Sequence, residues 1–243
     1  MGCSESAPVA PKPKEPLLSL PLRITFIRGD HIGVQPAQFN EGWCRKILPQ
    51  INSYFKVHGI RFDLIGTKEC GIETGPAEQA RQQLFSIDRD NDAQTNNAIR
   101  RKVFLEEVIP QYKTDSDAFN IYFFDFIGEK FQGITYKTTR TVIMGVRSTK
   151  GYATPTRRPD KCLAKTAAHE LGHALGLGHP RGQCHPDGTS QLFDEKLGRD
   201  NPDNLMCGGA DKRGGGGTGL LPWQIKIVRE EACTFLGLGV ENV

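Results

Sequence analysis

The run HELGHALGLGH, residues 169–179, holds three histidines and one glutamate at a spacing that could bind and use a metal ion. The segment contains no proline and many good helix formers, so we expect it to be helical up to about residue 177. His169 and His173 then lie one helical turn apart on the same face, where two imidazoles can bind one metal ion. Gly176 can adopt a positive φ angle and let the chain leave the helix, which would bring His179 to the metal as a third ligand. Three protein ligands leave a fourth position for water, which is typical of a catalytic zinc site rather than a structural one.

Glu170 follows His169 directly and is offset around the helix, so we expect it to hold a water molecule rather than the metal. Two alternatives stand beside this interpretation. His185 could be the third ligand in place of His179, although it lies beyond Pro180 and outside the spacing. The run could also be an ordinary buried helix with incidental histidines, because its other residues form an apolar face. The spacing of all the polar residues favours the metal site.

These residues match the HExxHxxGxxH signature, and the chain therefore resembles the metzincin metalloproteases. Metzincins carry a methionine in a tight turn beneath the metal, and residues 204–208 (NLMCG) look like that Met-turn, with Met206 as its methionine. The sequences HELGHALGLGH (residues 169–179), NLM (residues 204–206) and GLLPWQI (residues 219–225) are most similar to those of the compact bacterial matrixin-like branch. The resemblance covers roughly residue 21 to the end of the chain. No pro-domain or cysteine-switch motif is recognisable before the catalytic part.

The resemblance implies a zinc metalloendopeptidase with one catalytic Zn²⁺ ion held by His169, His173 and His179. Zinc would lower the pKa of a bound water and polarise the scissile carbonyl, while Glu170 would act as general base and then as general acid. The substrate would lie extended along a strand within residues 133–137, and Gly208, Gly209 and Ala210 would form the wall of a roomy pocket. We expect hydrolysis of extracytoplasmic proteins. The alternatives are a narrow-specificity peptidase of a single partner or a cell-wall peptide, and a catalytically silent zinc-containing binding module.

The apolar periodicity predicts one α/β (α+β) domain over residues 20–243. By resemblance, this domain is metzincin-like: a mixed twisted sheet with two long helices, the zinc helix at the cleft, and the Met-turn and C-terminal helix below it. We expect Asp160 to be the N-cap of the zinc helix. Strands are predicted at residues 20–28, 60–65, 118–127, 133–137 and 141–147, and helices at residues 39–57, 93–108, 160–177 and 222–236.

Residues 1–19 are rich in Pro, Ser, Lys and Glu and show no helical or strand period, which predicts a flexible tether. The start Met1-Gly2-Cys3 favours a bacterial lipoprotein, in which Cys3 is the lipidated residue and the signal segment has been removed or replaced. Gly2 to Ser6 also fits the MGxxxS myristoylation pattern with Cys3 as a second acylation site, and an unmodified start is the third alternative. We therefore expect an extracytoplasmic protein, secreted or anchored in the cell envelope, with an acylated intracellular protein as the alternative.

Six cysteines remain when Cys3 is set aside, and none of them forms a CxxC pair. This even number is compatible with three disulfides in an oxidising compartment. We place one of them between Cys184 and Cys207, where it would brace the loop after the zinc site. The alternative is that the cysteines are buried reduced thiols.

The partner we expect is a protein or peptide substrate, bound by a monomer. A net charge of +3 and the lack of a dense basic stripe argue against nucleic acid. The longest apolar stretch, residues 119–127, is too short to span a bilayer, so a membrane would be reached only through an N-terminal lipid anchor. Asp88, Asp90 and Asp92 resemble the start of a calcium loop, but Ala93 stands where such a loop needs glycine, so structural calcium is unsupported.

Overall fold

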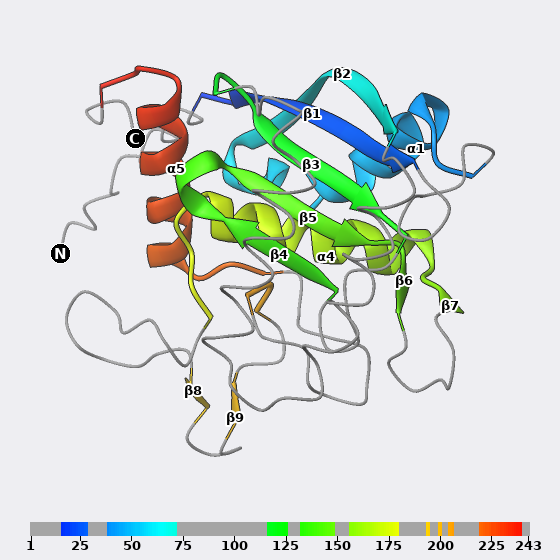
Figure 1. The fold of residues 1–243 in the computed structure, drawn as a ribbon. Coiled ribbons are helices and arrows are strands. Elements are labelled where there is room, and N and C mark those ends of the chain that lie inside the picture. Colours follow the sequence, from blue (N-terminus) through cyan, green and yellow to red (C-terminus); the bar gives the residue numbers. More distant parts are fainter. Residues whose placement is uncertain are drawn as a thin grey trace, which may run out of the picture.

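A five-stranded mixed sheet forms the centre of the computed structural model (Figure 1). In sequence order its strands are β1 (Leu18–Arg28), β2 (Ile60–Gly71), β3 (Phe119–Phe124), β4 (Gly133–Tyr136) and β5 (Thr141–Gly145). In space the order is β2-β1-β3-β5-β4. The first four of these in space are parallel, whereas β4 pairs antiparallel with β5 at the end of the sheet. Every residue of the central strand β3 is buried, as expected for a parallel strand in the middle of a sheet.

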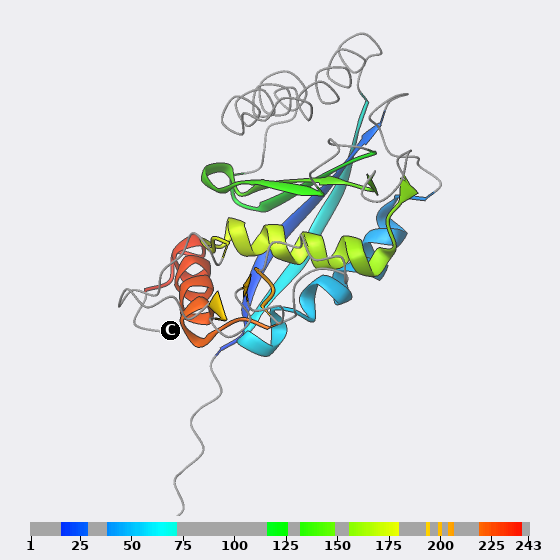
Figure 2. The ribbon, with the colours of Figure 1, turned by 90° about the horizontal axis from the view of Figure 1, so that it is seen from below.

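Three α-helices accompany the sheet among the residues that the structure describes. They are α1 (Glu41–Asn52), α4 (Asp160–Ala174) and α5 (Pro222–Phe235). Helix α1 packs against α4 and β2, and α4 packs against β4 and β5, so both helices cover the same face of the sheet (Figure 2). Helix α5 contacts β1 and lies by the C-terminal end of α4 (Figures 1 and 2). The described residues are 16–28, 38–71, 116–125, 132–148, 156–179, 193–194, 199–200, 204–206 and 219–239.

Short elements complete the described part of the chain. The 3-10 helix η1 (Lys56–His58) follows α1, and η3 (Lys137–Thr139) follows β4. Two small two-stranded ladders pair β6 (Arg147–Ser148) with β7 (Thr156–Arg157), and β8 (Phe193–Asp194) with β9 (Arg199–Asp200).

An aromatic cluster joins the sheet to α1 and α4. The ring of Trp43 on α1 packs edge to face against Phe26, Phe39 and Phe123, with ring centroids 6.2, 4.9 and 5.1 Å away. Such pairs add about 0.5–1.5 kcal/mol each beyond the burial of their area. The indole Nε1 of Trp43 donates to Asp160 Oδ1 at 3.1 Å, so the same residue fixes the start of α4. The core therefore sets the position of the helix that carries the histidines.

The predicted mixed α/β fold is confirmed, and its errors lie mainly at the ends of elements. Strand β1 begins at Leu18, two residues before the predicted start, and β2 continues to Gly71, six residues past the predicted end, because it pairs with β1 along its whole length. Helix α1 ends at Asn52 rather than at residue 57, because the Asn52 side chain bonds both backbone groups of Phe62 on β2. The strands β7, β8 and β9 were not predicted, since ladders of two residues leave no period in a sequence.

The prediction that Asp160 caps the zinc helix is wrong. Pro159 occupies the N-cap position of α4 without a side-chain hydrogen bond, and Asp160 is the first helical residue. Its carboxylate instead accepts hydrogen bonds from Trp43 and Lys46 of α1 and from Arg157. The helix also ends at Ala174 rather than at residue 177, because the left-handed residue Gly176 stops it.

The prediction of three disulfides is also wrong. Cys44, Cys70, Cys162 and Cys233 are free thiols, and all but Cys162 are buried. This matches the alternative of buried reduced thiols for three of the four. Burial raises the pKa of the Cys44 thiol to about 12 and also raises that of Cys70, so both are poor nucleophiles.

Several predictions fall outside the described residues. These are the pair Cys184–Cys207, the rival ligand His185, the pocket wall at residues 208–210, the acidic loop at residues 88–92, the helix at residues 93–108 and residues 1–15 of the tether, with Cys3. The last two residues predicted as tether, Leu18 and Ser19, belong instead to β1. In the part of the chain that is described, no helix combines the length and apolarity needed to cross a lipid bilayer.

Candidate metal centre

The three histidines predicted as ligands lie together at the end of α4. His169 and His173 are on the helix itself, and His179 follows three residues after Gly176. The Nε2 atom of His179 is 3.1 Å from the Nε2 atoms of both His169 and His173. Among the described residues this is the group of metal-ligating side chains whose donor atoms converge, all within 4.8 Å of one another.

The second nitrogen of each helical histidine bonds a backbone carbonyl. His169 Nδ1 lies 2.8 Å from the carbonyl oxygen of Leu205, and His173 Nδ1 lies 2.7 Å from that of Leu177. A carbonyl only accepts hydrogen bonds, so both Nδ1 atoms carry the proton and both Nε2 atoms present a lone pair. This is the tautomer in which a histidine binds a metal, and the carbonyl fixes the orientation of its ring.

Burial keeps these two imidazoles neutral. It lowers the pKa of His169 to about 4, although the bond to Leu205 acts in the opposite direction. It lowers the pKa of His173 to about 3, helped by the nearby His169. Neutral imidazole is the ligating form, so neither ligand has to lose a proton to bind a metal at pH 7.

The donor set fits zinc. Nitrogen ligands at about 2.0–2.1 Å from a tetrahedral zinc ion lie about 3.3 Å from one another, close to the 3.1 Å found here for two of the nitrogen pairs. With lone pairs on His169 and His173, one proton on His179 can satisfy only one of these two contacts. A cation among the three nitrogen atoms satisfies all of them. Three imidazoles suit zinc, and three protein ligands leave a position open for reaction.

Gly176 adopts a φ angle of 89°, the left-handed conformation expected of a residue that takes the chain out of the helix. Its position is fixed from two sides. A side chain here would meet Glu231 and Ile227 of α5 at 3.1 and 3.2 Å, and Lys137 Nζ donates to the Gly176 carbonyl at 3.2 Å. The turn that carries His179 is therefore held between α5 and η3, the 3-10 helix that follows β4.

The Glu170 side chain is almost fully buried, with 7% of its surface exposed, and it lies against β4. Thr135 Oγ1 is 2.6 Å from Glu170 Oε2 and 2.9 Å from the Glu170 carbonyl oxygen. A methyl group on Gly133 would come within 2.5 Å of Glu170 Cγ and 2.8 Å of Oε1. Gly133 and Thr135 are two residues apart on one strand and thus point to the same face. Together they form a seat for the carboxylate.

Burial also raises the pKa of Glu170 to about 7, while the bond to Thr135 and the charge of Arg158 lower it. The buried Arg158 guanidinium donates to the carbonyl oxygens of Gln132 and Gly145 at 3.2 and 3.0 Å, to Gln132 Oε1 at 2.8 Å, and to the hydroxyl of Thr166. Burial lowers the pKa of this guanidinium to about 10. Arg158 thus joins the start of β4 to α4 and places positive charge near Glu170.

Met206 lies where the resemblance places the Met-turn. The side chain is fully buried, and a methyl group added to Gly172 of α4 would come within 2.6 Å of its sulfur atom. The residue before it, Leu205, supplies the carbonyl that holds His169. Only a glycine at position 172 leaves room for the methionine to lie this close to the helix between the two helical ligands.

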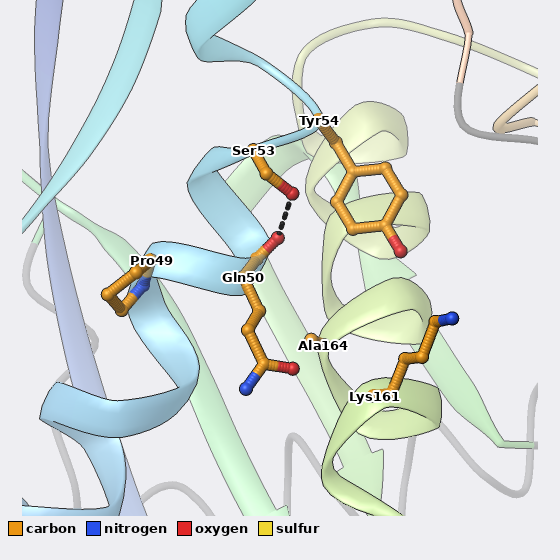
Figure 3. A pocket seen from close by; sticks show the side chains of 6 residues that line it. All are labelled: Pro49, Gln50, Ser53, Tyr54, Lys161 and Ala164. Atoms are coloured by element: carbon orange, nitrogen blue, oxygen red, sulfur yellow. Dashed lines mark hydrogen bonds between the residues drawn. The ribbon is translucent and has the colours of Figure 1, made fainter.

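A surface hollow between α1 and α4 does not belong to this centre (Figure 3). It is lined by Pro49, Gln50, Ser53, Tyr54, Lys161 and Ala164. The Ser53 hydroxyl donates to the Gln50 carbonyl at 2.7 Å within it. None of the histidines lines the hollow, and it lies at the N-terminal half of α4, away from the ligands.

The sequence predicts the three histidines that converge, but it does not point to the residues that position Glu170 beside them. Gly133, Thr135 and Arg158 carried no signal, because each acts on Glu170 through contacts between distant parts of the chain. A glycine followed two residues later by threonine in a predicted edge strand is a common pattern and points to no function by itself. Gln224 lies within residues 219–225, but nothing in the sequence relates it to Asn204.

The fold and the histidine cluster define a metzincin-like zinc peptidase. The model of the reprolysin-like metallopeptidases of family M12B matches residues 45–180, more than half of the 243-residue chain. The chain belongs to this family, and it is a zinc-dependent peptidase. The matching model is a reprolysin-like one, so the narrower resemblance to the matrixin-like branch remains a prediction.

Two solved structures are distantly similar to the chain. Archaemetzincin from Methanopyrus kandleri is 12% identical, with a TM-score of 0.45 over 92% of this chain and 98% of that one. A zinc-dependent peptidase from Methanocorpusculum labreanum is 13% identical, with a TM-score of 0.39 over 87% of this chain and 99% of that one. No curated protein matches the sequence.

Proposed function

We propose that the chain is an endopeptidase that hydrolyses extracytoplasmic proteins, with one zinc ion held by His169, His173 and His179 and with Glu170 as general base. The observation that supports this most directly is the convergence of three Nε2 atoms next to a buried carboxylate. Zinc supplies, when bound, a Lewis acid that polarises a carbonyl and makes a water molecule nucleophilic near neutral pH.

Glu170 takes the proton of the attacking water and returns it to the leaving amine. Thr135 holds Oε2 on the strand side, which leaves Oε1 to handle the proton. The Thr135 hydroxyl serves both states of the carboxyl group. It donates to Oε2 when the carboxylate is ionised, and it still donates to Oε2 when the proton is on Oε1. The carboxyl group therefore keeps its place through the proton transfer.

The edge strand β4 is the proposed site for the substrate backbone. It pairs with β5 on one side, and no other strand of the described sheet pairs with its second side. An extended peptide can add to such an edge as a further strand. Because Gly133 and Thr135 of the same strand seat Glu170, the strand that binds the substrate also positions the base. An edge of this kind accepts the middle of a longer chain, which is what an endopeptidase requires.

Replacing Glu170 tests the proposed function. Glu170→Gln keeps the size of the side chain but removes the base, so the rate of casein hydrolysis should fall by about 10²–10⁴-fold while zinc content stays the same. Glu41→Gln, on the exposed start of α1, is the matched control and should keep full activity. Full activity in Glu170→Gln or in Glu170→Ala would refute the role of the base.

Two other functions give different results in the same assays. A narrow-specificity peptidase, acting on a single partner or on a cell-wall peptide, would leave casein intact but cleave a few members of a broad peptide library. A catalytically silent binding module would hold zinc and cleave neither. The intact Glu170 argues against the silent module, because the base has no use in a protein that only binds.

The extracytoplasmic location and the lipid anchor are part of the proposal, and they rest on the composition of residues 1–19, with Cys3 as the proposed lipidated residue. The buried free thiols do not contribute to it. If Cys3 carries lipid, Cys3→Ala should move the protein from the membrane fraction to the soluble fraction. If Gly2→Ala, and not Cys3→Ala, moves the protein to the soluble fraction, this would favour intracellular myristoylation. We also propose that the protein is a monomer, which light scattering can check. We further propose that it belongs to the matrixin-like branch, which rests on the sequences of the motifs alone.

A further inference from the structure

Two buried amide side chains, Asn204 and Gln224, bond each other behind the metal centre. Asn204 Nδ2 donates to Gln224 Oε1 at 2.6 Å, and Gln224 Nε2 donates to Asn204 Oδ1 at 3.4 Å. Asn204 is 3% exposed and Gln224 is fully buried. A buried amide that loses its partner leaves polar groups unpaired away from water, which is unfavourable, so a buried pair of this kind fixes the two segments that carry it.

The pair joins the N-terminus of α5 to the Met-turn. Gln224 Oε1 also accepts from the backbone N–H of Leu221, the residue before α5, at 3.0 Å. Asn204 Oδ1 also accepts from the backbone N–H of Met206 at 2.9 Å. Each amide oxygen therefore holds one backbone N–H of its own segment and one N–H of the other side chain.

The Met-turn in turn holds a proposed ligand. The carbonyl of Leu205, between Asn204 and Met206, accepts from His169 Nδ1 at 2.8 Å. The backbone N–H of Leu205 donates to Gly219 at 2.8 Å, which fixes the turn from its other side. A carbonyl that bonds the second nitrogen of a ligating histidine sets the tautomer and orientation of the ring. A shift of the turn is therefore transmitted to the nitrogen that faces the metal.

We propose that the Asn204–Gln224 pair positions His169 for zinc, so that the C-terminal helix α5 helps to set the zinc affinity of the enzyme. This inference rests on the proposed role of His169 as a ligand. Asn204 and Gln224 are positioning residues, since neither side chain contacts the three histidine nitrogens. Loss of a direct partner of a ligating histidine typically weakens metal binding by about 10–100-fold, and we expect about 10-fold for this pair, which acts one residue further away.

The zinc affinity of Gln224→Ala, measured by competition with a chelator of known affinity, tests the inference. The matched control is Asn52→Ala, because Asn52 also bonds two backbone groups, the N–H and the carbonyl of Phe62, at 2.8 and 2.9 Å, and lies far from the metal centre. Both substitutions should lower the stability of the metal-free protein. Only Gln224→Ala should weaken zinc binding, by about 10-fold.

A second variant and a double variant separate positioning from general damage. Asn204→Asp keeps the acceptor for Met206 and loses the donor to Gln224, so it should weaken zinc binding in the same direction. The double variant Asn204→Asp/Gln224→Ala should lose less affinity than the two single losses multiplied together, because both substitutions break the same pair. Folding of each variant is checked by near-ultraviolet circular dichroism, and conclusions are drawn from those that fold.

Two results would overturn the inference. One is wild-type zinc affinity in folded Gln224→Ala and Asn204→Asp. The other is an equal loss of affinity in Asn52→Ala, which would reduce the effect to general destabilisation. His169→Ala separates this failure from that of the proposed function: if it binds zinc as tightly as the wild type, the ligand assignment itself is wrong. Strong loss in His169→Ala without loss in the amide variants refutes only the role of the pair.

Discussion

The substitution Gly133→Ala tests whether the edge strand seats the catalytic carboxylate. Gly133 is the first residue of β4, and its φ angle is not in the left-handed region, so the backbone accepts alanine without strain. The added methyl group would lie 2.5 Å from Glu170 Cγ and 2.8 Å from Oε1. The substitution therefore acts on Glu170 and not on the conformation of the strand.

The size of the effect follows from these distances. Non-bonded carbon atoms prefer about 3.5–4.0 Å, so the Glu170 side chain has to move away by about 1 Å. A displacement of about 1 Å in a catalytic group can cost about 100-fold in rate, which corresponds to about 2.7 kcal/mol. The stability of the protein should not fall by a similar amount, because alanine restricts the unfolded chain more than glycine does.

The assay is the hydrolysis of a quenched fluorescent peptide or of labelled casein, with zinc content and thermal stability measured on the same samples. We expect kcat to fall about 100-fold in Gly133→Ala with zinc retained. Gly71→Ala is the matched control, because Gly71 also lies in a strand and a methyl group there meets no atom of the described residues within 4 Å. It should leave kcat, zinc content and stability unchanged.

A rate in Gly133→Ala within about threefold of the wild type would refute the reasoning, since the contact distances leave no room for an undisturbed Glu170. An effect of Gly133→Ala on substrate binding is tested separately by introducing Gly133→Ala into the Glu170→Ala variant. There the methyl group has no carboxylate to displace, so the residual rate should not change further. A further large loss in that background would mean that Gly133→Ala damages the substrate edge instead.

Three further predictions concern Thr135, Asp160 and the metal. Thr135→Val should lower kcat about 10-fold with KM and zinc content unchanged, and Thr135→Ser should restore kcat. Thr141→Val is the control: it removes a buried hydroxyl bonded to Thr139 and should have no effect on kcat. Burial raises the pKa of Asp160, but the hydrogen bonds from Trp43 and Lys46 outweigh this effect and lower it. The ionised carboxylate therefore stabilises the fold at pH values above its unfolded pKa. This stabilisation is lost as the pH falls through the lowered pKa of the folded protein. Asp160→Asn should therefore cost about 1–2 kcal/mol at pH 7 in denaturant unfolding, and a cost that does not shrink toward pH 3 would contradict this. Chelation should abolish hydrolysis and lower Tm, and zinc at about 100 times its Kd should restore activity and add about 2.7 kcal/mol of stability, whereas activity that survives chelation would contradict a zinc peptidase.

Much of the metal centre is visible in the sequence because its information is local. The two helical histidines, Gly176 and His179 lie within eleven residues, and the geometry of a helix followed by a glycine turn is enough to bring them together. The main strands are visible for the same reason, since the alternation of apolar residues reports which face of a strand is buried.

The residues that hold the centre in place depend on contacts across the chain. Thr135 reaches Glu170 over 35 positions, and Gln224 reaches Asn204 over 20 positions. No period or motif records such pairs, because any polar residue that lies at the right place in space can serve. The misjudged Asp160 has the same origin: aspartate before a helix is a common cap, but here partners from α1 and Arg157 take its carboxylate.

The prediction of disulfides failed for a related reason. An even number of cysteines says nothing about their distances in space, and Cys44 and Cys233 lie in the apolar core, where a thiol behaves as a small hydrophobic side chain. Parity is informative in small secreted domains that lack a core, whereas this domain builds one from aromatic and aliphatic residues.

X-ray absorption at the zinc edge of the purified protein shows directly which atoms bind the metal. We expect one zinc ion per chain with three imidazole nitrogens and one oxygen at about 2.0–2.1 Å, and the loss of one imidazole in His179→Ala. A sulfur ligand at about 2.3 Å, fewer than three imidazoles in the wild type, or a coordination shell that His179→Ala leaves unchanged would contradict it.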